Sequence, residues 1–133
     1  MSDNHLSVQV LDIRVDEPVT VLTDIIIAAV CIYAFSRLAR MPGKNQLCRT
    51  LELFFLFLAT GTFLGGVLGH GLLYMLPPSL RLPGWIISMM AIAILEHASL
   101  ILIRKHISTS TGSLLKWQNI ILLAGFLIPV VIT

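Results

Sequence analysis

The stretch LELFFLFLATGTFLGGVLGHGLLYML, from Leu51 to Leu76, decides the fold. Apart from Glu52 and His70, its side chains are apolar, small or hydroxyl-bearing. About 20 such residues cross the ~30 Å hydrocarbon core of a bilayer as an α-helix. Within lipid, a helix satisfies its backbone hydrogen bonds inside one segment, and this run is too long for a barrel strand. We therefore predict a membrane-spanning helix over 51–76.

Three further apolar segments, at 19–38, 85–103 and 117–132, indicate additional spans. Of the 133 residues, 56% are hydrophobic and 12% are charged, whereas about a quarter of an average soluble domain is charged. This composition excludes a soluble globular enzyme, a disordered tail and a disulfide scaffold. We predict an all-α protein, an integral membrane four-helix bundle over 19–133 that follows an outer N-terminal tail at 1–18. The segment at 117–132 is the shortest of the four spans.

Turn-forming residues separate the expected spans. The predicted connections are Met41–Asn45, Pro77-Pro78 with Pro83-Gly84, and the Ser/Thr/Gly stretch Ser108–Ser113. In the tail, the alternation of Leu6, Val8 and Val10 indicates a short extended piece.

The basic residues predict the orientation. Most of them lie around the first and third connections, namely Arg37, Arg40, Lys44 and Arg49, then Arg104, Lys105 and Lys116. Cytoplasmic loops are enriched in Lys and Arg, so both termini should face outward. We expect a multi-pass protein of a bacterial cytoplasmic membrane with its N-terminus outside. Its expected partner is the lipid bilayer, with a second copy or another membrane protein as further candidates, and nucleic acid is not expected.

Gly61, Gly65 and Gly69 recur every four residues in the second expected span. Such small residues let another helix backbone approach closely, which is how helices pack in lipid. We predict that this ridge packs against a helix of the same chain, with a second copy as the alternative.

Ionisable residues inside the spans are the candidate functional residues, because each carboxylate costs up to ~3 kcal/mol at the centre of a membrane helix. At 100° per residue, Glu17 and Asp24 share one stripe of the first helix with Thr20, Ala28 and Cys31. Asp24 and His70 lie at matched depth, about 8–9 Å below the outer boundary. A polar cluster of Glu17, Asp24 and His70 is therefore expected in the outer half.

Three interpretations of Asp24 and His70 stay open. The pair is a buried hydrogen bond that fixes helix packing, part of a metal site with His70 as ligand, or a proton relay. A zinc site needs three or four protein ligands, and one His with one Asp does not supply them.

Glu96 is a further candidate near the midplane of the third span, where burial of a charge costs most. The adjacent His97 points about 100° away around the helix, so the two side chains are poorly placed to coordinate one ion together. Ser99 is expected to bond the carbonyl four residues earlier. Glu52, near the inner boundary, is expected to form a local ion pair with Arg49.

Two short runs carry a resemblance to a known group of proteins. The runs EPVTVLTD at 17–24 and LGGVLGHG at 64–71 resemble an uncharacterised family of multi-pass membrane proteins. That family is similar, more distantly, to the superfamily of alkaline ceramidases and progestin-and-adipoQ receptors. The resemblance implies a seven-helix fold in which His residues hold zinc for amide or lipid hydrolysis. An early helix of that superfamily carries a Ser-x-x-x-His motif whose His is a metal ligand. The resemblance implies that His70 corresponds to this His and Gly66 to the Ser.

The chain departs from that pattern in length and in its histidines. The resemblance covers about the first half of such a fold, so this chain looks like a shortened or truncated member. The superfamily takes two further ligands from a late His-x-x-x-His, which this sequence lacks, since its remaining histidines besides His97 are His5 and His106. A complete three-His zinc site therefore cannot form within one copy.

Three functional hypotheses follow. The first is a membrane protein with a non-enzymatic role, which follows from the incomplete ligand set. The second is a zinc-dependent membrane hydrolase of the ceramidase-like class, or a remnant of one, motivated by His70. The third is a small transporter or a subunit of a membrane complex, motivated by Glu96.

Overall fold

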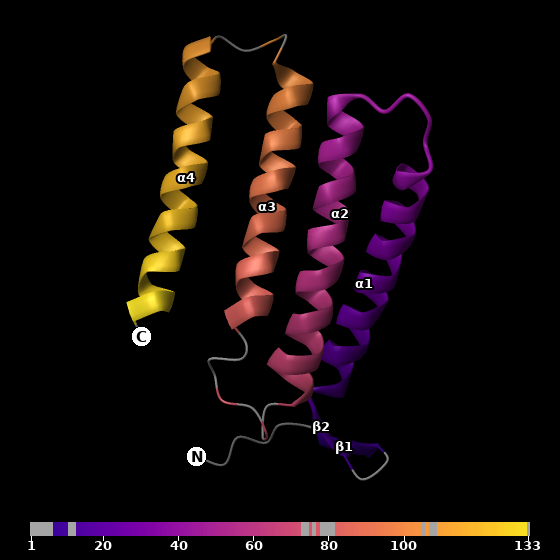
Figure 1. Ribbon diagram of the computed structural model, residues 1–133. Helices are drawn as coiled ribbons and strands as arrows, with labels where there is room; N and C mark the ends of the chain where they lie inside the picture. The colour runs from indigo at the N-terminus through magenta and orange to yellow at the C-terminus, as the bar shows by residue number, and fades with distance from the viewer. Residues whose placement is uncertain are drawn as a thin grey trace.

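The computed structural model describes residues 7–10, 13–72, 75, 77, 82–104, 106 and 109–132. Its elements are β1 Ser7–Val10, β2 Ile13–Asp16, α1 Pro18–Ala39, α2 Gln46–Leu64, the π-helix η1 Gly65–Gly71, α3 Leu82–Ile103 and α4 Thr109–Ile132. Apart from one small hairpin, the described elements are helices (Figure 1).

The predicted extended piece in the tail is one strand of an antiparallel hairpin. β1 pairs with β2 in a register that sets Ser7 opposite Asp16 and Val10 opposite Ile13. Leu6 lies outside the described residues. β2 leads directly into Glu17 and α1, and it contacts η1. The hairpin thus lies at the end of the helices where α1 begins (Figure 1).

Each of the four expected spans falls on a helix, and the helices begin earlier than predicted. α2 begins at Gln46 rather than Leu51, because the Asn45 side chain accepts a 2.8 Å hydrogen bond from the Cys48 amide and caps the helix there. η1 continues α2 to Gly71. Residues 73–74 and 76, which belong to the end of the predicted span, lie outside the described residues. This span was therefore correct in type and wrong at its start.

Two predicted connections are also shorter than expected. Pro83 and Gly84 belong to the first turn of α3 instead of preceding it. Proline is tolerated there because the first four amides of a helix have no acceptor within the helix. Similarly, α4 begins at Thr109, so most of the Ser/Thr/Gly stretch is helical.

Small residues make up the core. The buried apolar residues are Ala28, Cys31, Ala59, Ala91 and Ala98, and the large side chains of the described residues include none that is fully buried. Buried glycines accompany them on α2, η1 and α3. In water such a core would bury too little apolar surface, whereas membrane helices associate through close backbone packing of small residues.

Among the residues that the structure describes, three helices are long and apolar enough to cross a membrane: α1, α2 with η1, and α3. In the most apolar stretch of each, only 11%, 17% and 11% of the residues are buried. These helices therefore present apolar side chains outward along their length, as membrane-spanning helices do.

The helices follow one another in space as they do in sequence (Figure 1). α2 packs between α1 and α3, and α4 packs on α3. These contacts support four packed helices in a row, and closure into a four-helix bundle stays a prediction. A row is compatible with lipid, because apolar side faces need no protein cover there.

Candidate functional site

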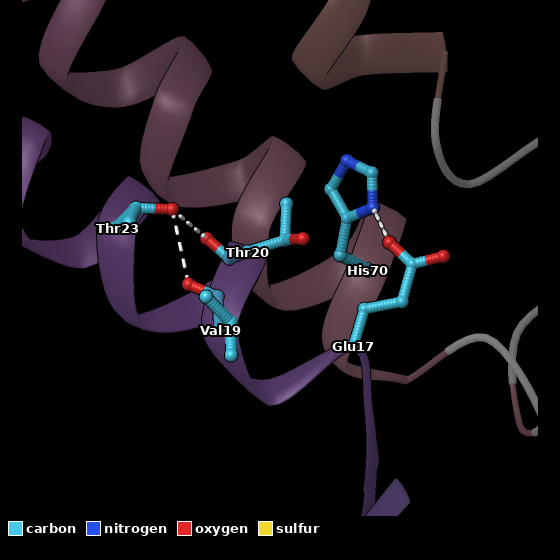
Figure 2. A network of polar contacts seen from close by, with 5 residues as sticks. All are labelled: Glu17, Val19, Thr20, Thr23 and His70. Carbon is cyan, nitrogen blue, oxygen red and sulfur yellow. Dashed lines mark hydrogen bonds and ion pairs between the residues drawn. The ribbon is translucent and has the colours of Figure 1, made fainter. Parts of the chain in front are cut away.

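A polar contact joins residues 53 positions apart at the hairpin end of the helices. His70 Nδ1 lies 2.8 Å from Glu17 Oε2 (Figure 2). The His70 side chain is 41% exposed and that of Glu17 31%. The pair therefore lies at the rim of the helices and not in their interior.

The backbone of Glu17 is unusual. It connects β2 to α1 with φ 49° and ψ 54°, in the left-handed region that residues other than glycine rarely adopt. Such a conformation costs about 1–3 kcal/mol and persists where surrounding structure enforces it. Here the hairpin fixes one side of Glu17 and Pro18, the first residue of α1, fixes the other. The turn leaves the Glu17 side chain directed at His70 (Figure 2).

His70 lies in the π-helix η1, four of whose seven residues are glycine. A π-helix closes its hydrogen bonds over five residues, so each residue turns less about the axis than in an α-helix. Leu72 N, for example, bonds Val67 O at 3.1 Å. π-Helical turns are rare and occur often at functional sites. The α-helical angles used to place His70 therefore cease to hold after Leu64.

The predicted contact between Asp24 and His70 is wrong. Within the described residues the hydrogen-bond partner of His70 is Glu17, and Asp24 makes no hydrogen bond or ion pair. Asp24 instead packs on Gly66, four residues before His70 in η1: a Cβ built on Gly66 would lie 2.7 Å from Asp24 Cβ. The π-helix accounts for the difference, because it changes which face His70 shares with the residues before it.

The tautomer of His70 follows from its partner. An ionised carboxylate only accepts hydrogen bonds. His70 Nδ1 therefore carries a hydrogen and donates the hydrogen bond to Glu17 Oε2. In the neutral ring, Nε2 then carries a lone pair, and it has no partner among the described residues. A carboxylate that accepts from one ring nitrogen fixes the orientation of the imidazole. The geometry thus presents Nε2 as a proton acceptor or as a single metal ligand.

A complete metal site is not found in the part of the chain that the structure describes. No three His, Cys, Asp or Glu side chains there lie close enough to hold one ion. Glu17 and His70 supply at most two ligands, whereas zinc sites use three or four.

The glycine ridge packs within the chain at two of its three positions. A Cβ on Gly61 would lie 2.5 Å from Ser88 Oγ and 2.9 Å from Ser88 N, and a Cβ on Gly84 would lie 3.0 Å from Gly65 N. Gly61 and Gly65 thus face Ser88 and Gly84 of α3, and the two residues of each pair are four positions apart. Gly69 is buried, but an added Cβ would meet no atom within 4 Å.

Glu96 lies apart from the outer pair. It lines a pocket between α3 and α4 together with Ser99, Leu100, Ile103, Leu115 and Gln118. The side chain of Glu96 is half-buried, and His97 is exposed. Ser99 Oγ donates a 3.0 Å hydrogen bond to Leu95 O, as its helical position predicts.

Glu52 pairs with a different cation than expected. Lys44 Nζ lies 2.6 Å from Glu52 Oε2, and Arg49 is exposed. Lys44 precedes the Asn45 cap, which directs the chain back over the start of α2. The pair still satisfies Glu52 near the predicted inner boundary.

The comparisons place the chain by family alone. Residues 19–133 match a family of unknown function, DUF6962. The chain belongs to this family. No curated protein and no solved structure matches it. The matched region contains Asp24, His70 and Glu96, and it begins after Glu17. The comparisons therefore support an uncharacterised family with membrane-capable helices, and the resemblance to the ceramidase superfamily stays a hypothesis.

Two features of the structure were not predicted from the sequence. One is the π-helix, for which the density of glycine at 65–71 was the available signal. The other is the matching small-residue face of α3, where Gly84, Ala91 and Ala98 recur every seven residues and are all buried. That spacing marks one face of a helix and was visible in the sequence.

Proposed function

We propose that this chain is a multi-pass integral membrane protein with a non-enzymatic role. Four spans, with both termini outside, put the Glu17–His70 pair at the outer surface and the Lys44–Glu52 pair at the cytoplasmic side. The observation that supports the proposal most is the uncovered apolar surface of α1, α2 and α3, where at most 17% of the residues in each apolar stretch are buried. A bacterial cytoplasmic membrane is the proposed location.

The non-enzymatic part of the proposal rests on the ligand set. Glu17 and His70 form a two-residue arrangement that orients an imidazole but leaves a metal short of ligands. The pair supports a different role: it ties the start of α1 to the end of η1 at the rim of the helices. Partly exposed polar contacts of this kind contribute at most about 1 kcal/mol.

The alternative is a zinc-dependent membrane hydrolase, or a remnant of one. The contact between Glu17 and His70 Nδ1 favours it, because metal-binding histidines commonly donate their second nitrogen to a carboxylate. The further ligands would have to come from a second copy or another protein.

Zinc analysis of the protein purified from membranes separates these functions. We expect far less than one zinc per chain, because two protein ligands bind the ion too weakly for it to remain through purification. His70→Ala should leave that content unchanged, with Glu52→Gln as a control for altered surface charge. Stoichiometric zinc that is lost in His70→Ala would overturn the non-enzymatic proposal and favour the hydrolase.

A transport role, or a role as a subunit of a membrane complex, is the third proposal. It is supported by the Glu96 pocket, which sets a carboxylate between two helices of the transmembrane domain.

A further inference from the structure

The pocket between α3 and α4 has about 170 Å³ of internal space. Four of its lining residues, Glu96, Ser99, Leu100 and Ile103, follow the spacing of one face of α3, and Leu115 with Gln118 do the same on α4. Glu96, Ser99 and Gln118 supply oxygen atoms that accept hydrogen bonds, and Leu100, Ile103 and Leu115 supply apolar walls. The pocket therefore has an acidic, hydrogen-bonding part and an apolar part.

The carboxylate of Glu96 is not satisfied by the described protein. It makes no hydrogen bond or ion pair with any described residue, although its side chain is half-buried. Seven residues separate it from the end of α3 at Ile103, about 10 Å along the helix. A carboxylate at that depth in lipid loses hydration, and a cationic hydrogen-bond donor placed against it would recover the lost free energy.

The other described carboxylates near the helices differ from Glu96 in their surroundings. Glu52 is paired with Lys44 and Glu17 with His70. Asp24 also makes no hydrogen bond or ion pair with a described residue, but its side chain packs on Gly66 and lines no pocket with the residues around Glu96. Glu96 alone among the described acidic residues lines this pocket. Glu96 is therefore the carboxylate that faces this pocket without a hydrogen-bond or ion-pair partner among the described residues.

The shape of the pocket narrows the class of ligand. Ca²⁺ and Mg²⁺ take six or more oxygen ligands, whereas three of the lining residues here carry side-chain oxygens. A metal ion would also leave the apolar walls and most of the space without contact. A primary ammonium group has three N–H donors, which Glu96, Gln118 and Ser99 can accept, and an attached alkyl group would contact the leucines and Ile103.

We propose that this pocket binds a protonated primary amine that carries an apolar chain, with Glu96 as the counter-ion. The pocket is partly open, so such an amphiphile enters from the bilayer between α3 and α4. The inference rests on the proposed membrane location and gives the third functional proposal a ligand class. An aminophospholipid headgroup and a free alkylamine share this chemistry.

Binding of radiolabelled octylamine to the full chain in phosphatidylcholine nanodiscs tests the proposal, with empty nanodiscs as background. We expect one saturable site per chain, weakened at least about tenfold in Glu96→Gln because a charge-assisted hydrogen bond is lost. Glu52→Gln, which alters a carboxylate outside the pocket, should bind as the parent does. Leu100→Trp, which fills the pocket and keeps the charge, should also abolish the site.

Competition experiments then fix the chemistry. Octanol, neutral and of equal length, should not compete. Phosphatidylethanolamine in the nanodiscs competes if the natural source is a lipid headgroup, and fails to compete if it is a free amine, and both results support the amine site. Absence of a saturable site, equal binding by Glu96→Gln, or equal competition by octanol would overturn it. A chain that does not enter nanodiscs at all would instead contradict the membrane location.

Discussion

Gly61→Ala is expected to lower the free energy of unfolding by about 1–3 kcal/mol, the usual cost of forcing extra atoms into a packed contact. The added methyl would lie 2.5 Å from Ser88 Oγ and 2.9 Å from Ser88 N. The hydroxyl can rotate away, but the backbone of α3 cannot yield without moving the helix. Because α2 packs on both α1 and α3, the loss would loosen the whole row.

Gly65→Ala is the matched control for Gly61→Ala. It makes the same substitution one turn later, at a position where an added Cβ meets nothing within 4 Å. Its effect should stay within about 0.5 kcal/mol, as for substitutions that disturb no contact. Unfolding by SDS in mixed micelles, followed by circular dichroism, measures both variants. Equal destabilisation by the two alanines would contradict the packing of Gly61 on Ser88.

Gly66→Ala is expected to destabilise the contact between α1 and η1 by a similar amount, about 1–3 kcal/mol. The new methyl would lie 2.7 Å from Asp24 Cβ and 3.2 Å from its Oδ2. The contact also gives a physical reason for glycine at position 66, because a side chain there would displace Asp24.

A second substitution should relieve this clash specifically. Asp24→Gly removes the Cβ that Gly66→Ala meets, at a cost of about 1 kcal/mol for glycine inside a helix. The double variant should therefore be more stable than the sum of the single effects by about 1–2 kcal/mol, within the range for residues in contact. Asp24→Ala keeps the Cβ and should give little relief. The same SDS titration decides, and additive effects in both double variants would show that Asp24 and Gly66 do not touch.

Much of the fold was predictable, because long apolar runs with few charges permit little besides membrane helices. All four expected segments are helical, and both buried residues of α1, Ala28 and Cys31, belong to the predicted polar stripe. Helix starts were less predictable. They depend on local caps such as Asn45, and polar residues before an apolar run extend a helix without any hydropathy signal.

The candidate site was only partly predictable. Asp24 and His70 were matched by depth, with Glu17 expected above them, but the partner of His70 in the structure is Glu17. Two backbone features decide this pairing, the left-handed turn at Glu17 and the π-helix at 65–71. Regular helical angles describe neither of them. The predicted ion pair of Glu52 with Arg49 was wrong for a similar reason. Lys44 contacts Glu52 from the irregular connection between α1 and α2, whose course no periodicity predicts.

The central claim is that the helices cross a membrane with the hairpin outside and the α1–α2 connection in the cytoplasm. Labelling of intact cells with an impermeant maleimide tests it most directly. The native Cys48 lies at the start of α2, and Cys31 is buried. In a Cys48→Ser background, Gln9→Cys marks the hairpin and Thr133→Cys marks the C-terminus. The account predicts labelling of both introduced cysteines on intact cells, and of Cys48 only after the membrane is permeabilised. Labelling of Cys48 on intact cells, with both introduced positions protected, would contradict it.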